Sequence, residues 1–138
     1  MLNIENYSKE YKTSNHLIYS CQYHVIFCPK YRRKVLNNGV DVRLKEIIYE
    51  VANQYDFTIC EMEVMEDHVH LLIDCNPKFG IAECVKKIKG ISSHKLRSEF
   101  PHLKSRIPTL WTRNCFISTV GTVSLDIVKQ YIEKQKYV

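Results

Sequence analysis

The order of strand-like and helix-like segments constrains the fold more than any other feature of this sequence. Aromatic and β-branched residues mark strands, and apolar residues at helical spacing mark amphipathic helices. The expected strands are His16–Cys28, Phe57–Met65, His68–Cys75 and Cys115–Val120, and the expected helices are Val40–Tyr55, Phe79–Phe100 and Ser124–Lys136. This order predicts an α+β fold of the ferredoxin-like, split βαβ type. It has an antiparallel sheet with helices on one face, followed by a C-terminal helix.

The size and charge of the chain suit one globular domain with a polyanionic partner. The chain has 138 residues, of which 45% are hydrophobic, and a net charge of +5. These values allow a single core over 1–138, with about 1–15 as a loose N-terminal segment. A positive charge favours nucleic acid without requiring it. No apolar run reaches the roughly 18 residues of a membrane span, and no targeting segment is visible, so we expect a cytoplasmic protein without membrane contact.

The six cysteines do not form a recognisable metal or disulfide framework. They are Cys21, Cys28, Cys60, Cys75, Cys84 and Cys115, and no two of them make a C-x-x-C pair. Because the N-terminal segment is polar rather than secretory, we expect free and mostly buried thiols.

The stretch "MEDHVHLLIDC" contains two histidines, His68 and His70, on an expected strand. Alternation along a strand places both imidazoles on one face and the intervening aliphatic residues on the core face. Such a pair could bind a metal, although two structural histidines would show the same pattern. Nearby acids that could support a metal site are Glu61, Glu63, Glu66 and Asp67.

Several other histidine chemistries are excluded by spacing. Histidine-triad hydrolases need a third alternating histidine, but position 72 is Leu. The helical H-x-x-x-H spacing of zincins and the P-C-x-x-C signature of zinc deaminases are also missing. No phosphate-binding G-x-x-x-x-G-K-[ST] loop occurs, so we expect no nucleotide cofactor.

The expected terminal helix places Tyr131 and Gln135 one turn apart. In isolation, Tyr131 would be an amphipathic residue at the core edge and Gln135 a solvated one. Two imidazoles and one amide oxygen would bind a divalent ion with open positions. A tyrosine beside that ion could attack a phosphate and form a phosphotyrosine ester. Such an ester conserves phosphodiester energy, which fits the missing nucleotide motif.

Five segments resemble the small IS200/IS605 insertion-sequence transposases, which are single-tyrosine HUH (His-hydrophobic-His) endonucleases. The segments are "DHVHLLID", "YHVIFCPKYRRKVL", "RLKEIIYEVA", "LWTRNCFISTVG" and "VKQYIEKQ", and the resemblance runs from about His16 to Gln135. It implies one HUH transposase domain over 1–138, with Tyr131 as the nucleophile. It also implies that His68, His70 and Gln135 bind Mg²⁺ or Mn²⁺.

The resemblance further implies the substrate and the assembly. The substrate would be single-stranded DNA with hairpins at the element ends, which the protein would cleave and rejoin. The protein would be a homodimer with composite active sites, pairing the histidines of one subunit with the tyrosine helix of the other. We expect 124–138 to form this mobile helix, with Gly121 as its pivot.

Basic clusters indicate where DNA would bind, although a single lysine is usually only solvated. The candidate phosphate contacts are Lys30, Arg32, Arg33, Lys34, Lys86, Lys87 and Lys89. The aromatic residues Tyr31, Trp111 and Phe116 could stack on unpaired bases or pack in the core. Three other functions remain open from sequence. They are a domesticated HUH nuclease acting on repetitive hairpins, a non-catalytic nucleic-acid-binding module and a small metal-binding regulator.

Overall fold

A computed structural model of the chain describes residues 12–14, 17–120 and 125–138. The proposed pivot, Gly121, and the expected N-cap of the last helix, Ser124, lie outside the described residues, as does most of the N-terminal segment 1–15. Within that segment, β1 (Lys12–Ser14) pairs with β2 (Leu17–Tyr19) as a small antiparallel ribbon. The single strand expected at 16–28 is therefore divided into β2 and a longer strand, β3.

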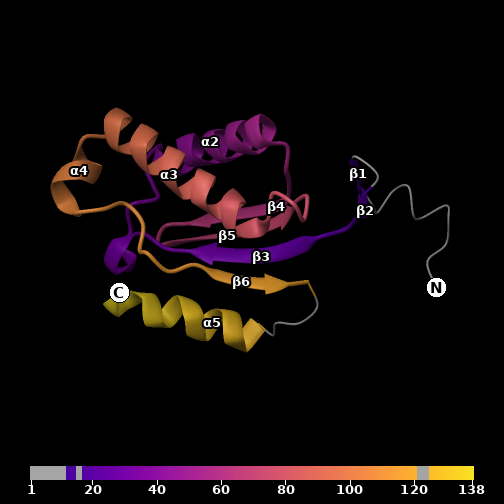
Figure 1. The fold of residues 1–138 in the computed structure, drawn as a ribbon. Coiled ribbons are helices and arrows are strands. Elements are labelled where there is room, and N and C mark those ends of the chain that lie inside the picture. The colour runs from indigo at the N-terminus through magenta and orange to yellow at the C-terminus, as the bar shows by residue number, and fades with distance from the viewer. Residues whose placement is uncertain (1–11, 15–16, 121–124) are drawn as a thin grey trace.

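The main sheet has four antiparallel strands in the order β4-β5-β3-β6 (Figure 1). These strands are β3 (Gln22–Phe27), β4 (Thr58–Met65), β5 (His68–Asp74) and β6 (Phe116–Thr119). The first and third strands of the split βαβ pattern lie at the centre, and the second and fourth lie at the edges. The structure thus confirms the predicted α+β fold and its order of elements.

Two long helices cover one face of this sheet (Figure 1). Helix α2 spans Val40–Tyr55, as its periodicity predicted, and α3 spans Ile81–Glu99. Their apolar faces pack on the sheet and bury a core that includes Val25, Phe27, Leu44, Ile48, Val69, Leu71, Ile88 and Leu96. Helix α3 begins after Gly80, whose φ of +87° is a conformation that favours glycine.

Short helical segments complete the chain at the end of the sheet where β3 ends and β5 begins. They are η1 (Lys30–Arg32), α4 (His102–Arg106) and η2 (Gln135–Tyr137). The sequence pattern did not predict η1 or α4, and it placed most of η2 within the expected terminal helix. The terminal helix α5 (Leu125–Lys134) runs alongside β6, away from α2 and α3 (Figure 1). Tyr31 and Arg32 in η1 both have positive φ values, 59° and 49°, which are uncommon for residues other than glycine.

The remaining features of the fold bear on smaller predictions. All six cysteines are free, and Cys28, Cys75 and Cys84 are buried. Helix α3 continues through Gly90, where an added Cβ would meet nothing within 4 Å. Within the described part of the chain, no helix has the length and apolar character needed to span a bilayer.

Candidate metal and nucleophile site

Strand β5 presents His68 and His70 on the sheet face opposite the main core. The alternating residues Val69, Leu71 and Ile73 are fully buried, whereas both histidines are only partly buried. This confirms the predicted common direction of the two imidazoles. A hollow of about 340 Å³ opens beside His70 and is lined by Glu61, Met62, Glu63, His70 and Leu72.

The ring of His68 is held by the carboxylate next to it in the chain. His68 Nδ1 lies 2.8 Å from Asp67 Oδ1. A carboxylate on Nδ1 favours the tautomer whose Nε2 carries the free lone pair, and metal-binding histidines are typically oriented in this way. Of the four acids proposed as support, Asp67 makes this contact, and Glu63 lies opposite His70 in the strand register.

His70 has an imidazole partner that the sequence pattern did not identify. His24 Nδ1 on β3 lies 3.1 Å from His70 Nε2, and the two ring centroids are 5.3 Å apart. Burial, together with the nearby His24, lowers the pKa of His70 and favours its neutral form. Only neutral imidazole can bind a metal ion.

Arg32 connects the histidine end of β5 to the end of α5. Its Nε lies 3.0 Å from Asp67 Oδ2, and its guanidinium also donates to the carbonyl of Ile132 and to Glu133, each at 3.2 Å. The Arg32 side chain is only 14% exposed. Arg32 was predicted to contact DNA, but here it forms a bridge from His68, through Asp67, to the segment that contains Tyr131.

Tyr131 lies on α5 with its hydroxyl turned inward. Its ring packs against that of Phe116, with centroids 5.2 Å apart. The hydroxyl oxygen is buried and has no hydrogen-bond partner among the residues that the structure describes. Burial, reinforced by the nearby thiols of Cys115 and Cys28, raises the pKa of Tyr131 well above its usual value near 10. In this position the phenol is protonated at neutral pH and sealed from solvent.

Gln135 is buried, contrary to its expected behaviour as an isolated solvated residue. Gln135 is only 3% exposed, and its Nε2 donates to the carbonyl of Tyr131 at 3.2 Å. Its Oε1 is buried without a partner in the described structure. A buried acceptor of this kind costs about 1–3 kcal/mol unless something binds to it.

The chemistry of these donors fits a divalent cation. No three His, Cys, Asp or Glu side chains of the described residues could together hold a metal ion. A metal ion held by the two histidines of β5 would therefore need a ligand of another type, and an amide oxygen such as Gln135 Oε1 is of a suitable type. Two nitrogens and one oxygen would leave coordination positions open for a substrate.

The predicted DNA contacts are divided between exposed and structural positions. Arg33 and Lys34 are exposed and line a hollow with Val35 and Arg106. Lys86 is exposed, whereas the ammonium groups of Lys30 and Lys87 lie over the rings of Tyr31 and Tyr55, each 5.1 Å from the centroid.

Lys89 holds a loop. Its ammonium donates to the carbonyls of Thr112, Arg113 and Asn114 at 2.6, 3.4 and 3.1 Å, and burial lowers its pKa. Trp111 is buried, donates to Ser92 Oγ at 3.0 Å and packs edge-on against Phe27. Lys89 and Trp111 therefore have clear structural functions.

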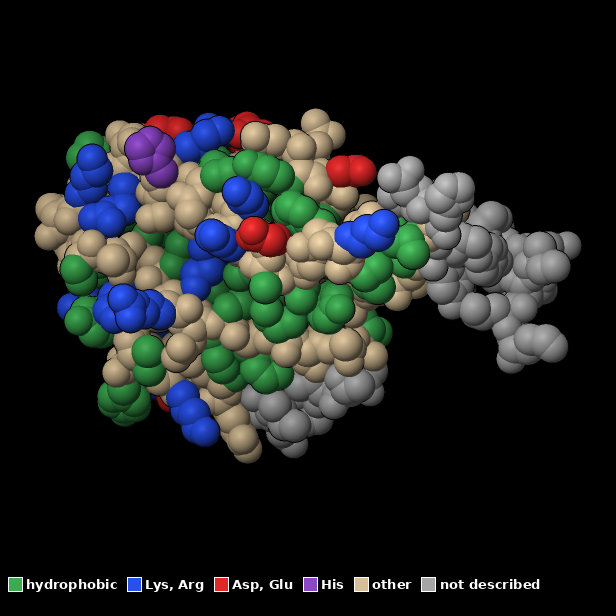
Figure 2. Space-filling view, viewed as in Figure 1, with side chains coloured by type: hydrophobic (Ala, Val, Ile, Leu, Met, Phe, Trp, Pro, Cys, Tyr) green, Lys and Arg blue, Asp and Glu red, His purple; other side chains and the backbone are tan. Residues whose placement is uncertain are grey.

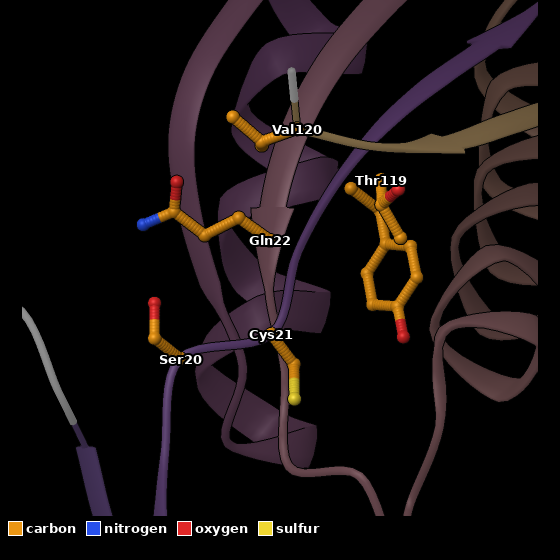
Figure 3. A pocket seen from close by; sticks show the side chains of 6 residues that line it. Ser20, Cys21, Gln22, Thr119 and Val120 are labelled. Carbon is orange, nitrogen blue, oxygen red and sulfur yellow. The ribbon is translucent and has the colours of Figure 1, made fainter. Parts of the chain in front are cut away.

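A separate hollow of about 350 Å³ lies at the opposite end of β3 from the histidine pair (Figure 3). It is lined by Ser20, Cys21, Gln22, Tyr23, Thr119 and Val120. Burial raises the pKa of the Cys21 thiol, so this cysteine is not activated as a nucleophile. None of the predicted site residues lies in this hollow.

Comparisons with known proteins converge on one family. The family described as "Transposase IS200 like" matches residues 17–135. ISDra2 transposase TnpA from Deinococcus radiodurans is 37% identical over 128 residues, covering 91% of each chain. A transposase of insertion sequence element IS200 from Salmonella typhimurium is 30% identical over 130 residues, covering 91% of this chain and 86% of the relative.

Solved structures show the same fold. A crystal structure of a Deinococcus radiodurans R1 protein assigned as a transposase superimposes with a TM-score of 0.83 at 36% identity. That alignment covers 92% of this chain and 99% of the other. A REP-associated tyrosine transposase bound to a REP hairpin shares the fold alone, with a TM-score of 0.53 at 14% identity. That alignment covers 88% of this chain and 69% of the other.

Proposed function

The chain belongs to the IS200-like transposase family, and we propose that it cleaves and rejoins single-stranded DNA at the ends of an insertion sequence. Membership supports a DNA-cleaving transposase. The mechanism, the metal and the assembly are proposals that follow the family resemblance, and the geometry of the described residues supports them. The observation that supports them is the link through Arg32 between Asp67, which orients His68, and the C-terminal segment, where the Tyr131 hydroxyl of α5 and the Gln135 amide oxygen of η2 are both buried without partners in the described structure.

The metal site would consist of His68, His70 and Gln135. Bound Mg²⁺ or Mn²⁺ would polarise the scissile phosphate and neutralise charge that develops on its oxygens. Asp67 would keep His68 in the correct tautomer, and Arg32 would hold Asp67 in place.

Tyr131 would form a bond to phosphorus as the bond between phosphorus and the 3′ oxygen breaks. The phenol loses its proton, and the departing 3′ oxygen gains one and becomes a free 3′ hydroxyl. In the second step, the 3′ hydroxyl of another strand attacks the phosphotyrosine, breaks the bond to Tyr131 and restores the phenol. The number of phosphodiester bonds is unchanged, so no nucleotide is needed.

Tyr131 would have to move before this chemistry, because its hydroxyl is buried. A buried, protonated phenol is a poor nucleophile, so α5 would have to present it to the phosphate from another position. A homodimer in which α5 of one subunit completes the site of the other would meet that requirement. As the family resemblance implies, we propose composite active sites, with subterminal DNA hairpins as the recognised feature. Action on DNA also fits the cytoplasmic location that the sequence predicted.

The direct test is a covalent adduct. Labelled single-stranded DNA from the sequence that flanks the gene is incubated with the protein and Mg²⁺, and a denaturing gel reveals any protein-bound label. We expect an adduct with the unchanged chain and none with Tyr131→Phe or with a chelator. An adduct formed by Tyr131→Phe would show that another residue is the nucleophile.

Strand transfer separates transposition from the related activities. If both element ends are supplied and cleavage occurs without joining, a domesticated nuclease is the better description. If hairpin DNA binds without any adduct, the chain is a non-catalytic binding module. A metal-binding regulator would bind the ion but show no preference for hairpin DNA.

A further inference from the structure

A basic hollow of about 470 Å³ lies between the outer side of α3 and the short helix α4. Its lining residues are Gly90, Ser93, His94, Arg97, Ser98 and Lys104. Those from α3 recur at helical spacing and occupy the side opposite the buried residues Ile88, Ser92 and Leu96. None of the lining residues is acidic, so the hollow has two permanent positive charges and no negative one.

The charges in this hollow differ from those of neighbouring basic residues. Arg43 on α2 and Lys95 on α3 are paired with Glu99 and Glu50. Arg97 and Lys104, in contrast, form no ion pair with any residue that the structure describes. Glu50 and Glu99 therefore pair with other cations, and the charges of Arg97 and Lys104 in the hollow stay unneutralised.

Arg97 is the residue of this hollow that best suits a phosphate. Its Nε is buried and has no hydrogen-bond partner within the described structure. A buried donor on a charged group is costly to leave unpaired, and a phosphate oxygen would satisfy it with a charge-assisted hydrogen bond. Arginine presents its N–H groups in a planar fork that matches phosphate geometry.

A second basic hollow, lined by Arg33, Lys34, Val35 and Arg106, has a volume of about 340 Å³. Helix α4 contributes Lys104 to the first hollow and Arg106 to the second. Figure 2 shows Lys and Arg side chains gathered over the end of the molecule at which α4 lies in Figure 1. The first hollow therefore belongs to a wider basic surface and is not an isolated cavity.

We propose that the hollow between α3 and α4 binds a backbone phosphate of the DNA substrate, with Arg97 and Lys104 as its charged ligands. This inference rests on the proposed function and adds to it a defined phosphate site between α3 and α4. Ser93 and His94 line the same hollow and add hydrogen-bonding groups. Such a contact positions the DNA without reading its sequence.

The first experiment measures the affinity of a fluorescent hairpin oligonucleotide, taken from the flanking sequence, in the absence of divalent metal. We expect Arg97→Gln and Lys104→Gln each to weaken binding about tenfold and to lower the slope of log K against log salt by about 1. The matched control is Lys45→Gln, because Lys45 is exposed on α2 and forms no ion pair with a described residue. The control should bind within about twofold of the unchanged chain, and circular dichroism checks that all variants fold.

The second experiment identifies the phosphate. Neutral methylphosphonates replace the phosphates of the hairpin one at a time. At the position that contacts Arg97, the replacement should weaken binding to the unchanged chain about tenfold but should have little further effect on Arg97→Gln. At other positions the replacement should affect both proteins equally.

The outcomes separate the hollow from the proposed function. Hairpin binding that is equally tight for Arg97→Gln and Lys45→Gln would overturn the phosphate site and leave the transposase proposal intact. A second assay follows the binding of inorganic phosphate by the broadening of its phosphorus NMR line. If phosphate binds the unchanged chain but not Arg97→Gln, while both proteins bind the hairpin equally, the hollow is a site for free phosphate rather than for DNA. If the unchanged chain binds no hairpin, both proposals are wrong.

Discussion

Replacement of Arg32 by Ala tests the bridge between the histidine pair and α5. The substitution removes the contact to Asp67, in which the two side chains are only 14% and 18% exposed, and the hydrogen bond to the Ile132 carbonyl. Removing one partner of a fully buried ion pair costs about 3–5 kcal/mol, and partial exposure reduces that figure. Asp67 also retains His68 as a partner.

The contact of Arg32 with Glu133 adds little to the loss of stability, because Glu133 is 65% exposed and solvent screens the pair. The charge-assisted hydrogen bond to Ile132 contributes about 1.5 kcal/mol or slightly more. We therefore expect Arg32→Ala to lower the free energy of unfolding by about 2–3 kcal/mol. Denaturation in urea, followed by circular dichroism, measures this change without DNA.

Arg33→Ala is the matched control, because Arg33 is the next residue, is exposed and forms no ion pair with a described residue. It should change the free energy of unfolding by less than about 0.5 kcal/mol. Hydrogen exchange should show faster opening of 129–138 in Arg32→Ala alone. Equal stability of the two variants would refute the bridge. A loss of hairpin affinity without a loss of stability would instead support the DNA contact predicted from sequence.

Three further substitutions each test one local feature of the structure by urea denaturation. Tyr131→Phe should raise the free energy of unfolding by about 1 kcal/mol, because it removes a buried hydroxyl that has no partner. The unchanged chain should also lose stability faster than Tyr131→Phe above about pH 10, where the tyrosine ionises in the unfolded state while its raised pKa keeps the buried phenol neutral. Lys89→Met should lower stability by about 2 kcal/mol through the loss of hydrogen bonds to the carbonyls of Thr112 and Asn114, and an increase would contradict that function. Gly90→Ala should raise stability by about 0.5–1 kcal/mol, since the helix gains a better helix-forming residue and the added Cβ meets no atom; a decrease would indicate a hidden contact.

The parts of the fold that sequence predicted well are those with local causes. Helix α2 has the predicted bounds because its buried residues recur with the period of a helix, among them Leu44, Ile48 and Val51. The direction of His68 and His70 follows from alternation within one strand, so it needed no knowledge of neighbouring strands. The order of elements then restricted the sheet to a small number of topologies.

The parts that sequence missed depend on contacts between distant segments. No sequence pattern marks His24 as a partner of His70, because only the register that pairs Ile26 with His70 brings the two rings together. Charge alone also cannot distinguish the partners of a basic side chain. The charge of Arg32 suits a phosphate as well as it suits Asp67, and Lys89 binds backbone carbonyls that no sequence pattern marks.

Three buried side-chain atoms in the described structure lack a hydrogen-bond partner: Arg97 Nε, Tyr131 Oη and Gln135 Oε1. Each such atom costs about 1–3 kcal/mol, and folded proteins contain few of them. The proposed DNA substrate and its metal ion would supply partners for all three, for Tyr131 only after the movement of α5 proposed above. A phosphate oxygen would accept from Arg97, a second phosphorus would react with Tyr131, and the cation on that phosphate would bind Gln135. Because Gln135 also donates to the Tyr131 carbonyl, the proposed nucleophile and the proposed third ligand lie one helical turn apart and would reach the substrate together.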